Sequence, residues 1–531
     1  MPTHEVENVP PPLAEVNRFT TDAVLMTADF EPSEAEQLDR LGELAGTTQA
    51  AEWGRLANSH PPELRTHDRF GHRIDEVEFH PAWHELLRVA VGHGLHATPW
   101  TCGRHVARAA GFYLWSQVEA GHGCPISMTY SVLPALRRAP DLAATLEPGL
   151  TSTTYDPGLR PPLSKSGLLA GMAMTEKQGG SDVRANTTRA APADGHYVLT
   201  GHKWFCSAPM CDVFLVLAQA PGGLSCFLVP RVLSDGGRNP FAIQRLKDKL
   251  GNRSNASAEV EFDGTHGYLV GAAGDGLPTI LDMVTLTRLD CVIGSAAGQR
   301  AAVVQAVHQA RHRRAFGSRL IEAPLMREVL ADLCVESAAA TALFLRLART
   351  VDDDERALAR LAIPAAKYWV CKRTVTVVAE ALECLGGNGY TESFPLARRY
   401  REQPVMALWE GSGNVVALDA LRALARAPES VAAFESEVWT AAGEHPLLDA
   451  HLVATRRLLR EAAVADADAA AWAARRLVEH LALALQGSLL VRTAPPAVTD
   501  AFIASRLGES RGHLYGLLPA GTDVTAILSR H

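Results

Sequence analysis

The 531 residues of this chain exceed the length at which one hydrophobic core usually divides, so the sequence predicts two to four domains. Hydrophobic residues make up 47% and charged residues 21%, as in an ordinary soluble globular protein, and the net charge of -8 excludes an overall basic field that would attract nucleic acid. No signal peptide is visible and no stretch reaches the roughly 18 apolar residues of a membrane span, so we expect a cytoplasmic protein without membrane segments.

The first predicted region is an N-terminal helical domain, residues 1–170. Residues 1 to about 30 are expected to form a loose arm, because Pro10-Pro11-Pro12 can neither continue a helix nor pair in a sheet. Helical patterns follow from Ser33, the predicted N-cap, to Glu147.

The second predicted region is a β-domain, residues 171–276. Short β-rich runs at about ten-residue spacing predict a small sheet or barrel. The strand candidates are Tyr197–Thr200, Val213–Ala218, Ser225–Val229, Ile243–Leu246 and Ala258–Phe262. No GxGxxG follows a strand, which argues against a Rossmann nucleotide site. The nine cysteines show no metal-ligand spacing and no disulfide pattern, so no metal site is predicted.

Long helical patterns return in the third region, residues 277–428, and predict a helical bundle. The segments are Gly294–Arg311, Pro324–Thr350 and Ala357–Leu385, the last with a possible kink or restart at Pro364. Residues 429–531 predict an additional C-terminal helical domain. The fold class is therefore mainly α with a small β-domain.

The stretch from Leu408 to Asn414, L-W-E-G-S-G-N, places the Glu410 carboxylate between an aromatic ring and a Gly-Ser-Gly-Asn turn. Backbone amides in such a turn can approach a ligand closely, because glycine lacks a Cβ. A carboxylate beside apolar bulk tends to have a raised pKa, which suits a proton-abstracting base. The alternative is an ordinary exposed glutamate before a loop.

A second motif lies more than two hundred residues upstream. Met174 to Asp182, M-T-E-K-Q-G-G-S-D, combines hydroxyl side chains with a glycine pair, which can hydrogen-bond a planar polar ring and a phosphate. His202 to Ser207 adds aromatic faces beside a hydroxyl.

The order of these features resembles the acyl-CoA dehydrogenase flavoprotein family: helices, a strand-rich middle opening with M-T-E-x-x-x-G-S-D, and a bundle ending in E-G-[ST]-x-x. The segments T-E-K-Q-G-G-S-D, Leu246–Asn255 and W-E-G-S-G-N are similar to those of its alkylation-response AidB branch. The resemblance implies an acyl-CoA dehydrogenase-like fold, FAD as cofactor and a small acyl-CoA-like substrate.

The resemblance also implies cofactor roles for the matching residues. Met174 and Thr175 would lie against the isoalloxazine ring, and Ser181 would reach the pyrophosphate. Phe205 would place an aromatic ring against the flavin, and Ser207 a hydroxyl near its N5. The stretch from Leu408 to Asn414 would hold the adenine half or the phosphates, with Trp409, Gly411, Ser412, Gly413 and Asn414 as the cofactor-binding set.

In the family an acid at the position of Glu410 removes the α-proton of a thioester while the β-hydrogen leaves as hydride to flavin N5. The family's other base position matches Thr287, which is not an acid, so Glu410 is the candidate catalytic base. Arg288 would orient the substrate, or would pair with Asp290 or another carboxylate.

Two further segments imply a homo-oligomer, expected to be a tetramer. Arg314 and Phe316 in R-A-F-G, and Gly386 and Gly387 in L-G-G-N-G-Y, match family segments that reach the FAD of a neighbouring subunit. The alternative for Arg314 is an exposed charge within a basic cluster.

In the AidB branch, an added C-terminal segment of this kind is linked with the binding of double-stranded DNA. Here residues 429–531 hold nine arginines, no lysine and twelve acidic residues, a net charge of -3, which does not favour DNA. A basic face would need several arginines to converge, namely Arg456, Arg457, Arg460, Arg475, Arg476, Arg506 and Arg511. The alternatives to a dehydrogenase are a DNA-associated flavoprotein protecting against alkylation damage, with weak or vestigial activity, and a flavin monooxygenase or nitroalkane-type oxidase.

Overall fold

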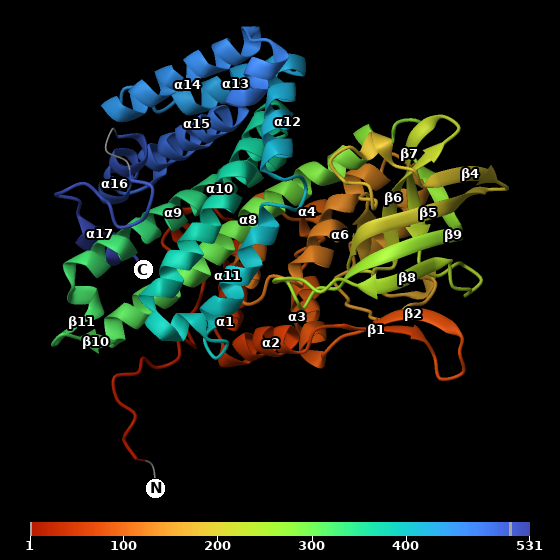
Figure 1. Cartoon of the computed structure of the whole chain (residues 1–531), viewed down its shortest axis with the longest axis horizontal. Coiled ribbons are helices and arrows are strands. Elements are labelled where there is room, and N and C mark those ends of the chain that lie inside the picture. Colours follow the sequence, from red (N-terminus) through yellow and green to blue (C-terminus); the bar gives the residue numbers. More distant parts are fainter. Residues whose placement is uncertain (1–2, 509–511) are drawn as a thin grey trace. The chain divides into compact units, whose positions relative to one another are not determined.

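The computed structural model describes residues 3–508 and 512–531, and the chain forms two compact units (Figure 1). The helical unit comprises Met1–Thr48, His105–Gln117 and Cys291–His531. The barrel unit comprises Gln49–Arg104 and Val118–Asp290. The chain is mostly helical with a small β-region, which confirms the predicted fold class.

The barrel unit is built on a seven-stranded sheet. Its strands are β3 (Ala170–Ala173), β4 (Arg189–Ala193), β5 (His196–Ser207), β6 (Val213–Ala220), β7 (Gly223–Pro230), β8 (Phe241–Leu246) and β9 (Ser257–Val270). Neighbouring strands follow the order β3-β6-β4-β5-β9-β7, β8 pairs with β9, and β7 also pairs with β6. That last pairing closes the ladder into a barrel, and the strands of this barrel lie together in Figure 1.

All five predicted strands are present, but β3 and β4 were not predicted. Both are short and consist mainly of alanine, glycine and proline, which have low strand propensity. Their sequences therefore lack the β-branched or aromatic pattern that predicts a strand. Their pairing with β6, and that of β4 with β5, holds them in the sheet.

The helical prediction for Ser33–Glu147 missed a hairpin. The helices of the barrel unit in this stretch are α2 (Thr48–Ser59), α3 (Pro81–Gly92), α4 (Thr98–Thr101), α6 (Gly123–Leu136) and α7 (Pro140–Leu150). Between α2 and α3 the chain forms β1 (Glu63–His67) and β2 (Arg73–Glu78). Asp75 accepts a hydrogen bond from Arg73 (2.7 Å) and one from the Ile243 backbone in β8 (3.1 Å). The hairpin therefore depends on a distant strand.

Helix α8 (Gly276–His312) belongs to both units: its residues up to Asp290 are part of the barrel unit, and those from Cys291 onward are part of the bundle of the helical unit. The further elements of the bundle are α1 (Pro32–Ala45), α5 (His105–Ser116), α9 (Pro324–Asp352), α10 (Arg356–Cys384), α11 (Pro395–Met406) and α12 (Gly413–Arg426). Helix α10 runs through Pro364 without a break. Ser33 is not the N-cap of α1. Glu31 takes that place, with Pro32 at the first helical position and the Glu31 amide donating to Glu34 (2.9 Å).

The N-terminal arm is not loose along its whole length. Glu15 donates through its backbone to Gly46 (2.8 Å), and its carboxylate accepts from the Thr48 backbone (3.0 Å). Tyr113 on α5 donates to buried Asp22 (2.7 Å). The second half of the arm is thus held by polar contacts that its sequence pattern does not reveal.

The C-terminal helices lie in the same compact unit as the bundle. They are α13 (Pro428–Trp439), α14 (Pro446–Val464), α15 (Ala467–Thr493), α16 (Pro496–Leu507) and α17 (Val524–Leu528). Arg506 pairs with Asp332 of α9 (2.6 Å), and Arg346 of α9 pairs with Glu437 of α13 (2.7 Å). Partly buried ion pairs thus fasten the added segment to the bundle. None of the helices within 3–508 and 512–531 has the length and apolar character needed to cross a membrane.

The seven arginines that would have to form a basic face are partly neutralised. Arg456 pairs with Glu435 (2.7 Å), Arg457 lies 3.6 Å from Glu461, and Arg506 is bound to Asp332 and Glu336. Arg511 lies outside the described residues. These contacts add to the negative charge of the segment as reasons against DNA binding.

Candidate functional site

The motif from Met174 to Asp182 forms a compact turn directly after β3. The Trp204 amide of β5 donates to the Thr175 carbonyl (2.8 Å), which extends the sheet by one pairing. The Gly179 amide donates to the Glu176 carbonyl (3.0 Å) and closes the turn. A Cβ atom on Gly180 would lie 2.4 Å from the Thr175 hydroxyl oxygen, so only glycine allows this approach. Ser181 follows on the exposed side of the turn.

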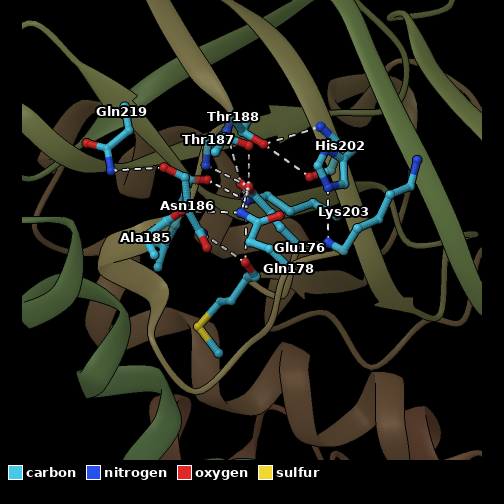
Figure 2. A network of polar contacts seen from close by, with 12 residues as sticks. Glu176, Gln178, Ala185, Asn186, Thr187, Thr188, His202, Lys203 and Gln219 are labelled. Carbon is cyan, nitrogen blue, oxygen red and sulfur yellow. Dashed lines mark hydrogen bonds and ion pairs between the residues drawn. The ribbon is translucent and has the colours of Figure 1, made fainter.

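A buried carboxylate fixes this turn (Figure 2). Glu176 is fully buried and accepts five hydrogen bonds, three of them from neighbouring backbone or hydroxyl groups. Its donors are Thr187 N (2.6 Å), Thr187 Oγ1 (2.9 Å), Thr188 N (3.1 Å), Gln178 Nε2 (2.7 Å) and Lys203 Nζ (2.9 Å). The acid therefore joins the turn to the segment before β4 and to β5.

Lys203 completes the cluster from β5, with no exposed side-chain surface. Its ammonium also donates to the Leu217 carbonyl (2.7 Å) and the Met174 carbonyl (3.4 Å). Burial would raise the pKa of Glu176, but the Lys203 ammonium and the hydrogen bonds outweigh it and hold that pKa well below its usual range. Burial lowers the pKa of Lys203 to about 8, against the pull of the Glu176 carboxylate. Both groups are charged at neutral pH.

Sequence reasoning missed the roles of Glu176 and Lys203. A usable signal was a lysine within a strand next to two aromatic residues, because an isolated charge in a buried strand needs a partner. The partner, Glu176, stood inside the motif already singled out.

Phe205 and Ser207 lie at the end of β5, which continues to Ser207, beyond Thr200, where the predicted strand ended. The register of β5 on β9 shifts between Lys203 and Cys206, which interrupts the in-out alternation and leaves both Trp204 and Phe205 outside the core. The Phe205 side chain is 51% exposed, and Lys247 Nζ lies 4.7 Å from its ring centroid. The barrel unit thus presents an accessible aromatic face at this strand end.

The motif from Leu408 to Asn414 links α11 to α12. Glu410 has φ 57° and Gly411 φ 107°, so the acid itself adopts a left-handed conformation that non-glycine residues rarely take. Lys367 of α10 is buried, with only 1% of the residue exposed. Its ammonium donates to the carbonyls of Ala407 (3.4 Å) and Gly411. This buried lysine holds both ends of the turn that carries Glu410.

The end of the motif begins α12, with Ser412 at the N-cap. A Cβ atom on Gly413 would lie 2.6 Å from Cε of Lys372, so this position also admits only glycine without movement of that lysine. Asn414 accepts a hydrogen bond from Arg475 Nε of α15 (2.8 Å). A helix of the added C-terminal segment therefore contacts the loop that follows the candidate base.

Arg314 and Phe316 form a small hairpin after α8, with strands β10 (Arg314–Ala315) and β11 (Ser318–Arg319). Its two-residue turn has φ 52° at Phe316 and 84° at Gly317, and the Phe316 side chain is fully exposed. A pocket of about 360 Å³ lies in this part of the helical unit. It is lined by Gln309, Arg313, Leu320, Met326, Glu383, Cys384, Leu385, Gly386, Gly387 and Asn388. Two of the predicted glycines and the residue before Arg314 thus border one cavity.

Arg288 is buried on the part of α8 that belongs to the barrel unit, next to Thr287, which donates to the Val284 carbonyl (3.1 Å). The predicted residues therefore fall into two sets. Met174, Thr175, Ser181, Phe205, Ser207 and Arg288 lie in the barrel unit, and Trp409 to Asn414, Arg314, Phe316, Gly386 and Gly387 in the helical unit.

Comparison with known proteins assigns the class of this fold. Residues 171–265 match the acyl-CoA dehydrogenase middle domain, and residues 274–425 match the acyl-CoA dehydrogenase C-terminal domain. Residues 8–157 match the adaptive response protein AidB N-terminal domain. The chain is 49% identical over 435 residues to the AidB protein of Escherichia coli (strain K12), covering 80% of each chain.

The solved structures similar to this chain include two relatives with bound ligands. ACDH-11 of Caenorhabditis elegans in complex with C11-CoA has a TM-score of 0.87 at 25% identity, covering 95% of this chain and 93% of that one. An acyl-CoA dehydrogenase of Bacillus anthracis complexed with FAD has a TM-score of 0.72 at 16% identity, covering 93% and 89%, which shows a shared fold. The chain belongs to the acyl-CoA dehydrogenase family, in the branch that carries the AidB N-terminal domain. The predicted family and branch are confirmed.

Proposed function

We propose that the chain is an FAD-dependent oxidoreductase that dehydrogenates an acyl-CoA-like thioester, with Glu410 as the catalytic base. The observation that carries the proposal is the left-handed backbone of Glu410, held by the buried Lys367. A strained conformation at a charged residue persists only where the surroundings impose it, and such positions cluster at functional sites.

The side chains of the barrel unit fit a flavin. Phe205 offers a half-exposed aromatic face, Thr175 a hydroxyl packed on Gly180, and Ser181 a hydroxyl on an exposed turn. The B. anthracis relative, which is complexed with FAD, supports the same cofactor here. FAD, when bound, supplies the hydride acceptor and the redox chemistry, whereas the protein supplies orientation and proton transfer.

The protein itself contributes acid–base chemistry to the reaction. The Glu410 carboxylate takes the proton from the α-carbon of the thioester, and a turn fixed at both ends keeps that oxygen in place. The C. elegans relative bound to C11-CoA supports an acyl-CoA substrate. We keep Arg288 as the candidate that orients the substrate, because it is buried beside the residue at the family's other base position.

We extend the proposal to a homotetramer in which Arg314, Phe316, Gly386 and Gly387 contact the cofactor of a neighbouring subunit. A fully exposed phenylalanine in a left-handed turn, near a pocket bordered by Gly386 and Gly387, supports this role. The cytoplasmic location and the four-region division at 170, 276 and 428 stay predictions.

The DNA-associated alternative is not favoured. The C-terminal segment of the chain carries a net negative charge, and three of the arginines that DNA binding would need are paired with carboxylates. Phosphate neutralisation requires unpaired cations that converge on one face.

The test is the reduction of bound flavin by an acyl-CoA panel, followed by visible absorption. Wild-type protein is expected to be yellow and to bleach, and Glu410→Gln to retain FAD but bleach about 10²–10⁴-fold more slowly, the usual contribution of a general base. Glu444→Gln, at an exposed glutamate of the same unit, serves as the matched control. Bleaching of Glu410→Gln at the wild-type rate would show that the base is misassigned.

A further inference from the structure

Asn8 attaches the N-terminal arm to the hairpin β10–β11, although the two lie more than three hundred residues apart in the sequence. Asn8 Nδ2 donates to the Arg314 carbonyl (2.8 Å), and the Arg314 amide donates to Asn8 Oδ1 (2.7 Å). One carboxamide thus satisfies both backbone groups of Arg314, as the next strand of a sheet would do.

Two more contacts hold the arm in this position. Arg313 Nη1 donates to the Asn8 carbonyl (2.7 Å), and His308 Nε2 lies 2.7 Å from the Pro11 carbonyl. Asn8 itself has φ 57°, a left-handed conformation that asparagine tolerates better than most residues. The arm segment therefore has a defined conformation at the hairpin, and asparagine at position 8 suits the left-handed backbone found there.

The hairpin needs an external restraint. Its ladder is short: Arg314 pairs with Arg319 and Ala315 with Ser318, and the Leu320 amide adds one hydrogen bond to the Arg313 carbonyl (2.9 Å). A two-stranded hairpin alone is marginal in water. Its turn also places Phe316 in a left-handed conformation, and the fully exposed ring is not packed against the described residues of its own chain, so contacts within the chain do not offset this strain. The hydrogen bonds of Asn8 act on the first residue of this hairpin.

We propose that Asn8 is a positioning residue for cofactor binding: the arm fixes the hairpin so that Arg314 and Phe316 keep the conformation in which they bind FAD of a second copy of the chain. The inference rests on the proposed function, since it assigns Asn8 an effect on the same cofactor. Asn8 does not touch the cofactor; it acts through the backbone of Arg314.

The test compares FAD binding and hairpin protection in Asn8→Ala and wild-type full-length protein. FAD affinity is measured by titrating apoprotein, and protection of the Arg314 amide by hydrogen exchange. Asn8→Ala is expected to weaken FAD binding about tenfold and to speed exchange of the Arg314 amide, while the activity at saturating FAD stays close to wild type. Glu5→Ala, an exposed position of the same arm, is the matched control and is expected to bind FAD like wild type.

A double-mutant cycle separates positioning from general loss of stability. If Asn8 acts through the hairpin, adding Asn8→Ala to Phe316→Ala weakens FAD binding little beyond Phe316→Ala alone, because the affected contact is already absent. The inference about Asn8 is overturned if the effects of the two substitutions are fully additive, or if Asn8→Ala binds FAD as tightly as the wild-type protein. In either case the proposed function stands as long as the wild-type protein itself binds FAD. Failure of wild-type protein to bind FAD overturns both.

Discussion

Lys203 in the barrel unit and Lys367 in the helical unit are both buried lysines that hold a predicted site loop, yet their partners differ. Lys203 forms an ion pair with Glu176 at 2.9 Å and donates to two carbonyls. Lys367 donates to the carbonyls of Ala407 and Gly411, and within the described part of the chain no carboxylate lies at ion-pair distance from it.

This difference in partners indicates that Lys203 is needed for folding of its domain, whereas Lys367 restrains only the loop that it contacts. Removing one member of a buried ion pair leaves the other charge uncompensated, which destabilises the whole domain. Removing an ammonium that binds carbonyls leaves neutral acceptors, which can recover part of their hydrogen bonding if the loop moves. We therefore expect the loop at Met174 to be rigid and essential for folding, and the loop at Glu410 to be adjustable and essential for activity.

The largest effect is expected for Lys203→Met. It leaves the buried Glu176 carboxylate without its counter-ion and should lower the free energy of unfolding by about 3–5 kcal/mol, measured by urea denaturation followed by circular dichroism. The double variant Glu176→Gln/Lys203→Met should recover much of this loss, because no buried charge remains unpaired. Lys177→Met, at an exposed neighbour, is the control. Equal stability of the single and double variants would contradict the ion-pair explanation.

Acid provides a second way to test the comparison. The pKa of Glu176 is lowered in the folded chain, so between that value and its ordinary value of 4.5 the unfolded chain binds a proton that the folded chain does not. The stability that Glu176 contributes is therefore present above about pH 4.5 and is lost as the pH falls below it. Urea denaturation at a series of acidic pH values should show this loss.

Glu176→Gln should reduce the slope of stability against pH in that range, whereas Lys367→Met should leave the slope unchanged. Glu119 behaves in the same direction as Glu176, since its contact with His122 outweighs burial and keeps its pKa below the usual range. Some slope therefore remains in Glu176→Gln. An unchanged slope in that variant would show that the buried pair does not titrate with folding.

Lys367→Met should have a smaller effect on stability and a clearer one on activity. We expect a loss of about 1–3 kcal/mol from carbonyls left without a donor, and a fall in kcat of roughly a hundredfold, because the base is displaced from the reacting carbon. Unfolding curves and flavin reduction rates are the measurements. Lys367→Arg should restore part of the activity. An unchanged kcat in Lys367→Met would mean that the turn keeps its shape without this lysine.

The smallest effect is expected for Arg475→Ala. The hydrogen bond to Asn414 is exposed, so its loss should lower stability by less than about 1 kcal/mol. A change of a few-fold in KM at unchanged kcat would indicate that α15 influences the loop after the base. Arg476→Ala, at the next exposed position of the same helix, is the control, and equal kinetics in both variants would argue against such an influence.

The sequence by itself determined the class of the protein and most of its regular elements. Alternating and apolar runs marked β5 to β9, and long patterns without breakers marked α9 and α10, because these signals reflect burial of side chains at fixed local spacing. The two motifs around Thr175 and Glu410 identified the family, because glycine and hydroxyl residues at set spacing are readable along the chain.

Only the tertiary structure decided how these motifs are held. Glu176 meets Lys203 across 27 residues, Lys367 meets Gly411 across 44, and Asn8 meets Arg314 across 306. The same holds for β1, β2, β3 and β4, whose residues are strands only because other strands accept them. Such contacts depend on where distant segments meet in space, and no local spacing of residue types encodes that position.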